Sequence, residues 1–135
     1  VGGKKYLASG DKYYLSDHAI RYAKLGTKKL DFGHVYENMV ALELLRRGWE
    51  IYIGVLYKKE IDFVAIRRDE RVYIQVSDDI SRQETFEREV APLLAIRDAY
   101  PKMVIARTKH EAVDYEGIKV VDLARWLMGE GSDVE

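Results

Sequence analysis

The hydrophobic pattern of this 135-residue chain predicts an α/β domain in which helices flank a central mixed sheet. Apolar residues recur with the spacing of one helix face in three segments. The segments between them are short and apolar or alternating, as is typical of strands. The expected order is a helix at about 31–47, strands at about 49–57, 60–66 and 71–77, a helix at about 83–99, strands at about 103–106 and 117–121, and a helix at about 122–128.

An N-terminal hairpin and a short helix are expected ahead of this core. Lys4–Ala8 and Lys12–Leu15 flank a turn that contains glycine, which predicts the hairpin. A helix capped near Asp17 is expected to continue to about Leu25. We therefore divide the chain into a basic extension at 1–29, a main domain at 30–129 and an acidic tail at 130–135.

The first 29 residues carry seven Lys or Arg against two Asp, a net charge of +5, although the whole chain has a net charge of −1. A basic segment on an acidic body favours contact with DNA or with an acidic partner. A solvated, lysine-rich surface is the alternative. The candidate nucleic-acid contacts are Lys4, Lys5, Lys28 and Lys29.

The helix expected at about 31–47 has a stop signal in Gly48 and an unusual carboxylate in Glu37. Glu37 falls on the apolar side of the helix, beside Val40 and Leu44. A carboxylate among aliphatic side chains costs free energy unless it is paired or binds a metal. Glu37 is thus a candidate metal ligand, and the alternative is a salt bridge or backbone hydrogen bonds.

The strand expected at 60–66 is apolar on both faces, which is typical of a central strand. Regular alternation assigns Ile61 and Phe63 to one face and Val64 to the other. Asp62 interrupts this pattern and is the second candidate ligand. The alternative is an aspartate at a frayed strand start.

In the strand expected at 71–77, alternation assigns Gln75 and Ser77 to one face, with Tyr73. Asp62 and Gln75 are expected on neighbouring strands, with Glu37 facing them from a packed helix. Lys58 is a further candidate, because a strand that begins there would point Lys58, Glu60 and Asp62 to one face. The alternative is that Lys58 lies in a hairpin turn.

The chain contains no cysteine, which excludes disulfides and thiolate metal sites. Its sequence shows no signal peptide and no apolar run of membrane-spanning length. We therefore expect no membrane association and a cytoplasmic location.

The order helix carboxylate, strand carboxylate and a third motif on the next strand resembles the PD-(D/E)XK nuclease superfamily, which has the restriction-endonuclease-like fold with an αβββαβ core. More narrowly, the chain resembles the C-terminal domain of unknown function that follows an AAA-type P-loop ATPase in many prokaryotic proteins. The motifs that carry the narrower resemblance are Tyr13-Tyr14-Leu15-Ser16-Asp17, Glu37-Asn38, Leu44-Leu45-Arg46-Arg47-Gly48, Lys59-Glu60-Ile61-Asp62-Phe63, Pro92-Leu93-Leu94-Ala95-Ile96 and Tyr100-Pro101-Lys102.

This resemblance implies an upstream ATPase module in the same chain and a Mg²⁺ site at Glu37, Asp62 and Gln75. The superfamily motif ends in Glu/Asp-x-Lys, where this chain has Gln75-Val76-Ser77. Gln75 offers a carbonyl oxygen without charge, and Ser77 offers no cation. Losing a proton-transfer or charge-stabilising group typically costs about 10²–10⁴ in rate. We therefore expect weak Mg²⁺ binding and little or no DNA cleavage.

The function that the sequence predicts is a catalytically degenerate nuclease-fold module of an AAA-type ATPase, acting in docking, recognition or regulation, with DNA as one candidate partner. The first alternative is an active metal-dependent DNA endonuclease in which Lys58 is a relocated catalytic lysine. The second is a domain that binds only protein.

Overall fold

The computed structural model describes residues 14–15, 20–25 and 34–129, and they form an α/β domain with a mixed sheet and three helices. The predicted α/β class is therefore confirmed. The helices are α1 (Val35–Arg46), α2 (Gln83–Leu94) and α3 (Leu123–Leu127). The strands are β1 (Tyr14–Leu15), β2 (Ile20–Lys24), β3 (Glu50–Leu56), β4 (Lys59–Arg67), β5 (Glu70–Val76), β6 (Lys102–Ala106), β7 (Val113–Tyr115) and β8 (Ile118–Asp122).

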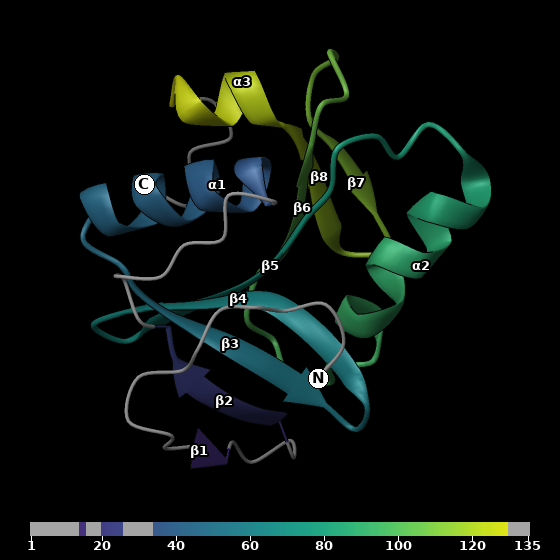
Figure 1. The fold of residues 1–135 in the computed structure, drawn as a ribbon. Helices are drawn as coiled ribbons and strands as arrows, with labels where there is room; N and C mark the ends of the chain where they lie inside the picture. The colour runs from purple at the N-terminus through teal and green to yellow at the C-terminus, as the bar shows by residue number, and fades with distance from the viewer. Residues whose placement is uncertain (1–13, 16–19, 26–33, 130–135) are drawn as a thin grey trace.

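The sheet changes from antiparallel to parallel pairing at β5 (Figure 1). Its strand order is β1-β2-β3-β4-β5-β6-β8-β7. Neighbours are antiparallel from β1 to β5, parallel from β5 through β6 to β8, and antiparallel again between β8 and β7. The parallel pair β5–β6 needs a crossover connection, and α2 supplies it.

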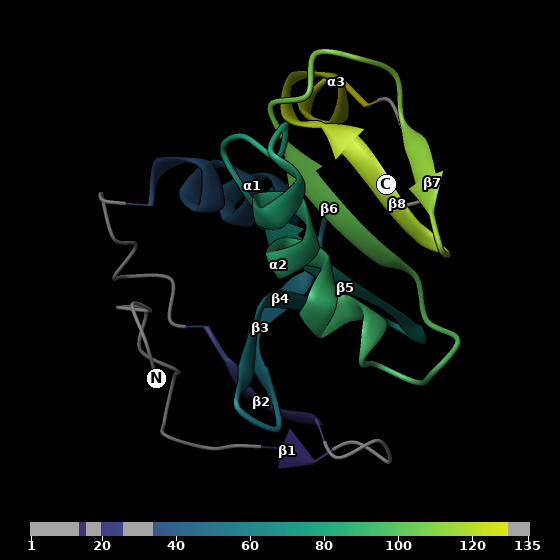
Figure 2. The same cartoon turned by 90° about the vertical axis from the view of Figure 1, so that its right-hand side faces the viewer.

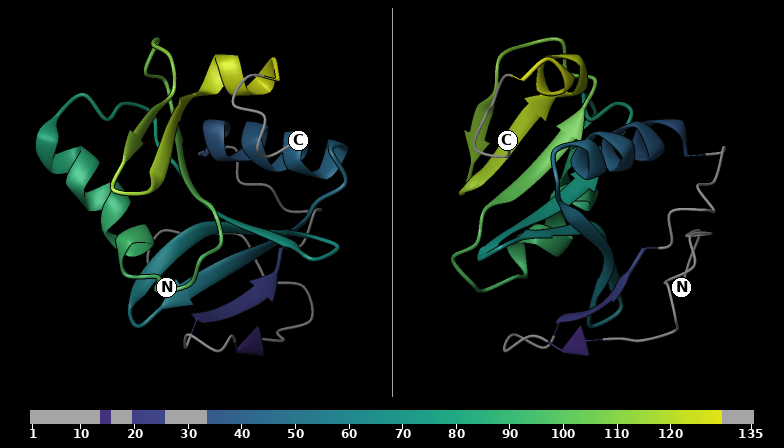
Figure 3. Two further views of the ribbon diagram at one scale, coloured as in Figure 1. Left: turned by 180° about the vertical axis from the view of Figure 1, so that it is seen from behind. Right: turned by 90° about the vertical axis from the view of Figure 1, so that its left-hand side faces the viewer.

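The helices α1 and α3 cover one face of the sheet and α2 covers the other (Figures 1 and 3). Leu44 of α1 and Trp126 of α3 belong to one buried cluster with Phe63 of β4. Leu93 of α2 belongs to a second cluster with Tyr73 of β5. Fully burying a side chain of this kind contributes about 1.5–3 kcal/mol. The two clusters therefore fix α1 and α2 on opposite sides of the central strands.

The end of α1 follows the prediction made from Gly48. This residue has a φ of +90°, and its N–H donates to the Leu45 carbonyl at 3.0 Å. The N–H of Trp49 returns to the Leu44 carbonyl, also at 3.0 Å. A left-handed residue that closes the last turn in this way favours glycine.

The prediction of a short helix that reaches Leu25 is wrong, because Ile20–Lys24 form the strand β2. This strand pairs with β3 from Ile20↔Leu56 to Lys24↔Tyr52. The pairing satisfies the backbone groups along an edge of β3 that would otherwise lack a partner. The local sequence pattern of residues 20–24 does not indicate that they pair with β3, which lies about 30 residues further along the chain. The predicted strand Lys4–Ala8 lies outside the described residues.

The C-terminal half departs from prediction in two places. The second helix was expected at about 83–99 with a kink or break at Pro92, and it ends at Leu94, two residues after this proline. Proline lacks an N–H and its ring disturbs the preceding turn, which weakens a helix at that point. The three-residue strand β7 was not predicted, and it forms by pairing with β8 across a turn at Glu116-Gly117.

Candidate functional site

The strands β4 and β5 separate at the point where Asp62 and Gln75 lie. Their antiparallel ladder extends from Arg67↔Glu70 to Phe63↔Ile74. Beyond it, the Gln75 Oε1 atom accepts from the Asp62 backbone N–H at 2.7 Å, and the Asp62 Oδ2 atom accepts from the Val76 N–H at 2.8 Å. Two side chains thus bridge the strands where the ladder ends, at what we call the fork. The prediction that Asp62 and Gln75 lie on neighbouring strands is confirmed.

A bulge in β4, at Asp62 and Phe63, interrupts the regular alternation of its side chains. The pairs Tyr52↔Val64 and Gly54↔Ile61 leave two residues of β4 opposite the single residue of β3 between them. Ile61 therefore packs in the same cluster as Val64, which corrects the regular alternation expected from the sequence. A Cβ atom at Gly54 would lie 3.0 Å from Val64 Cγ2 and 3.2 Å from Ile61 Cβ, so this close approach favours glycine.

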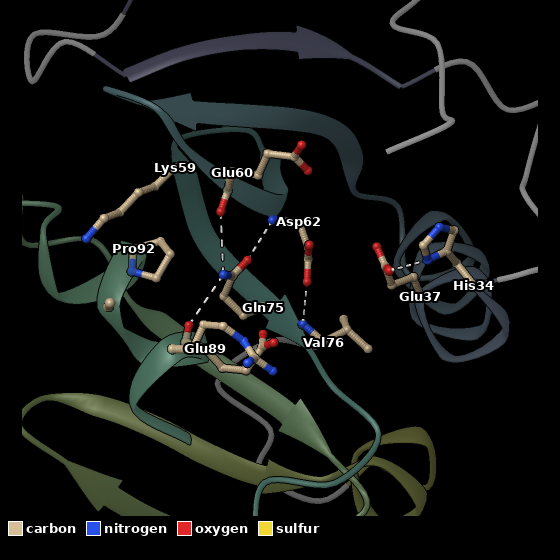
Figure 4. A pocket seen from close by; sticks show the side chains of 11 residues that line it. His34, Glu37, Lys59, Glu60, Asp62, Gln75, Val76, Glu89 and Pro92 are labelled. Atoms are coloured by element: carbon tan, nitrogen blue, oxygen red, sulfur yellow. Dashed lines mark hydrogen bonds and ion pairs between the residues drawn. The ribbon is translucent and has the colours of Figure 1, made fainter. Parts of the chain in front are cut away.

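The Gln75 side chain is almost fully buried and binds three backbone groups, two in β4 and one in α2. It is 5% exposed. Besides accepting from Asp62, it donates through Nε2 to the Glu89 carbonyl at 3.3 Å and to the Glu60 carbonyl at the 3.5 Å limit of a hydrogen bond (Figure 4). The partners determine which end of the amide is oxygen, because one is a donor and two are acceptors. A carboxylate could not donate to these carbonyls, so the site suits glutamine as it stands.

The fork opens into a pocket of about 550 Å³ between α1 and α2. The carboxylate side chains in its lining outnumber the cationic ones by four to two, so the pocket carries an excess of two negative charges when His34 is neutral. Such a pocket attracts cations and repels a bare phosphate group. Its lining residues are His34, Glu37, Lys59, Glu60, Asp62, Gln75, Val76, Arg88, Glu89, Ala91 and Pro92.

Glu37 reaches this pocket from the first turn of α1. Its Oε2 atom lies 2.9 Å from the His34 Nδ1 atom, and its side chain is 14% exposed. A carboxylate in the first turn of a helix is also favoured by the helix dipole. Glu37 and Asp62 line the same pocket, as expected, and the contact with His34 was not predicted.

The remaining candidates occupy other positions. Lys58 lies in the two-residue turn between β3 and β4 and is exposed, so the strand begins at Lys59 and it is Lys59 that lines the pocket. Ser77 follows β5 and lines a neighbouring pocket of about 310 Å³. The lysines Lys4, Lys5, Lys28 and Lys29 lie outside the described residues.

Sequence reasoning missed the contribution of α2. Arg88, Glu89 and Pro92 line the pocket, and the Glu89 carbonyl accepts from Gln75. Pro92 has no N–H to donate to the Arg88 carbonyl one turn earlier, which loosens the helix backbone at this site. The proline was the available signal, but nothing local indicates which strand α2 packs against.

The fork fits a three-ligand Mg²⁺ site poorly. Within the described segments of the chain, no three His, Cys, Asp or Glu side chains are placed to hold a metal ion together. One Asp62 oxygen and the Gln75 carbonyl oxygen already accept backbone N–H groups. Glu37 and Asp62 are the two carboxylates that could contribute to a weak site, since Mg²⁺ is held by oxygen ligands.

Fold and site together define an α/β domain with an acidic pocket at the fork of a mixed sheet. The chain is 37% identical over 128 residues to an uncharacterized protein of Haemophilus influenzae. The matched region is 95% of this chain but 31% of that protein, so the chain spans about a third of its relative's length. No family model and no solved structure matches the chain. No helix among the described residues is both long and apolar enough to span a membrane.

Proposed function

We propose that this chain is a PD-(D/E)XK-like domain that has lost nuclease chemistry and acts in docking, recognition or regulation beside an AAA-type ATPase module. The order of α1, β3, β4, β5, α2 and β6 agrees with the αβββαβ core of that superfamily. The relative in H. influenzae is about three times as long as the region it shares with this chain, which leaves room for a further domain in that protein.

The observation that carries the proposal is the hydrogen bonding of Gln75. At the position of the superfamily's third acidic ligand, this chain has an amide whose oxygen and nitrogen both bind backbone groups. The Asp62 carboxylate likewise accepts the Val76 N–H. Groups that would hold a metal in an active nuclease hold the backbone together in this domain.

The strongest alternative is an active nuclease with a relocated lysine. Lys59 and Arg88 line the pocket that contains Glu37 and Asp62, so cations lie near the two carboxylates. Lys58 is less suited to this role, because it lies in the turn. The excess of negative charge in the pocket favours a third possibility, a domain that binds only protein, unless a metal neutralises the carboxylates.

Metal titration by calorimetry and plasmid nicking with Mg²⁺ or Mn²⁺ test the proposal. We expect at most weak metal binding and no nicking that depends on Asp62. Nicking by the wild-type chain that is lost in Asp62→Ala would contradict a degenerate site.

The neighbouring lysines provide a matched pair for the alternative. Activity lost in Lys59→Ala but kept in Lys58→Ala would identify Lys59 as the relocated lysine, and the reverse result would identify Lys58. If the ancestral geometry persists, Gln75→Glu combined with Ser77→Lys should tighten Mg²⁺ binding. Unchanged affinity in that double variant would mean that Glu37 and Asp62 have purely structural roles.

A further inference from the structure

The turn between β3 and β4 holds an aromatic residue in an unfavourable backbone conformation. The pair Leu56↔Lys59 closes a two-residue turn formed by Tyr57 and Lys58. Tyr57 has a φ of +58°, in the left-handed region where glycine and asparagine are favoured and a bulky side chain is strained. Strain that persists in a folded protein is a reason to look for a function.

Two other hairpin turns adopt the same conformation with polar residues. Arg68, between β4 and β5, has a φ of +57°, and Glu116, between β7 and β8, has a φ of +50°. Both side chains are suited to solvent. Among the non-glycine residues with positive φ in the described parts of the chain, Tyr57 alone is aromatic. The turn geometry therefore does not by itself require a tyrosine.

The Tyr57 side chain is also unusually accessible. It is 76% exposed, whereas tyrosine usually buries most of its ring. The turn lies at the end of the molecule opposite α3 (Figures 1 and 2). None of the other large hydrophobic side chains exposed in the described residues belongs to β3, β4 or this turn. A protein interface normally needs a wider apolar patch than one ring.

The residues that follow Tyr57 are cationic. Lys58 and Lys59 are both exposed, and Figure 4 shows the Lys59 side chain extending towards α2. Arg88 of α2 lines the same pocket as Lys59. One exposed ring followed by two exposed lysines suits an unpaired base and its adjacent phosphates in a nucleic-acid strand.

We propose that the β3–β4 turn binds single-stranded nucleic acid, with Tyr57 stacking on an unpaired base and Lys58 and Lys59 contacting the adjacent phosphates. A duplex offers no unpaired base along its length, so the turn should prefer a single strand. Lys58 is not a lining residue of the acidic pocket, and Lys59, which does line it, is exposed to solvent. The inference goes beyond the function proposed for the fork, because it requires neither a metal nor cleavage.

The test is fluorescence anisotropy of the full chain with a labelled oligothymidine of about 12 nucleotides, within the site size of such proteins, and with a duplex of the same length. We expect the wild type to prefer the single strand. Tyr57→Gly should weaken binding about tenfold, which is typical of losing one stacked base, and Tyr57→Phe should stay within about twofold. Lys58→Gln and Lys59→Gln should each lower the slope of log affinity against log salt by about 0.7, the value for one phosphate contact on a single strand.

Arg68→Gly is the matched control, because it relieves the same backbone conformation and removes a cation at another turn. Its affinity should stay within about twofold of wild type. Tyr57→Gly should melt at the same temperature as wild type or higher, since glycine removes the strain. Tyr57→Asn, which also tolerates this conformation, serves as a second variant if the glycine variant folds poorly.

Three results would overturn the proposal. The first is undetectable binding of the single strand by wild type at low salt. The second is equal affinity of wild type and Tyr57→Gly. The third is equal affinity for single strand and duplex, which would indicate contact with the backbone alone. Failure of this proposal leaves the nicking result untouched, so the two can be judged separately.

Discussion

Two aspartates of the sheet accept backbone N–H groups, Asp122 at the end of β8 and Asp62 at the fork, and their surroundings differ. Asp122 is 6% exposed, accepts from the Lys109 N–H at 2.7 Å and caps α3 by accepting from the Arg125 N–H at 3.2 Å. Asp62 is only partly buried and accepts the Val76 N–H beside an open pocket.

The pKa of Asp122 reflects this enclosure. Burial raises the pKa of its carboxyl, but the backbone N–H groups of Lys109, Arg125 and Thr108 outweigh burial and hold the pKa below its ordinary value. The pattern of a strand therefore does not distinguish a structural carboxylate from a pocket carboxylate. The surrounding backbone donors and the solvent-accessible space distinguish them.

The largest effect is expected at the end of β8. Asp122→Ala should lower the free energy of unfolding by about 3 kcal/mol, since it removes the cap of α3 and takes the acceptor from the N–H groups of Lys109 and Arg125. Asp114→Ala is the control, because Asp114 is an exposed residue of β7 whose carboxylate accepts the Gly117 N–H at 3.4 Å, and the change should cost less than about 0.5 kcal/mol. Urea unfolding at neutral pH measures both. Equal losses of unfolding free energy in the two variants would contradict a special structural role for the Asp122 carboxylate.

The same carboxyl gives a pH signature. Because its pKa is lowered in the folded state, its charged form contributes stability that is fully present above the unfolded pKa of about 3.9 and is lost as pH falls through the folded value. The stability difference between wild type and Asp122→Asn should therefore shrink below about pH 4. Urea unfolding across that range would reveal it, and a difference independent of pH would contradict it.

A smaller but more informative effect is expected at Gln75. Gln75→Glu should lower stability by roughly 2 kcal/mol at neutral pH, because a carboxylate would face the Glu60 and Glu89 carbonyls and lose both donations. Gln75→Met, which has similar size and no charge, separates lost hydrogen bonds from repulsion. Thermal unfolding with and without Mg²⁺ measures the effect. Wild-type stability in Gln75→Glu, or a large rise in its stability with Mg²⁺, would favour a retained metal site.

The smallest effect is expected for Asp62→Asn. An amide oxygen can still accept the Val76 N–H, so the loss of unfolding free energy should stay below about 1 kcal/mol. Asp62→Ala removes the acceptor and should cost more. Guanidinium unfolding measures the free energy of unfolding of both variants and of Asp122→Asn under the same conditions. If Asp62→Asn and Asp122→Asn lowered the free energy of unfolding equally, the Asp62 carboxylate would have the same structural role as that of Asp122.

Much of this architecture followed from local pattern, because burial on one or two faces leaves a period in the sequence. The strands around Asp62 and Gln75 and the helix that presents Glu37 were predicted within a few residues. The β4 bulge was not predicted, because it depends on how β3 and β4 pair. The position of Lys59 at the pocket follows from the hairpin turn, which shifts the strand start by one residue.

The sequence by itself determined the α/β class, the order of the central elements and the glycine that ends α1, since these depend on side-chain periodicity and on backbone preferences of single residues. It also showed an amide, Gln75, at the position that we propose to correspond to an acidic ligand of the nuclease superfamily. Only the tertiary structure decided that residues 20–24 join the sheet. It also brought the Glu89 carbonyl of α2 to the Gln75 amide. Both contacts join segments far apart in the chain, and a local pattern records that a group is buried but not which partner buries it.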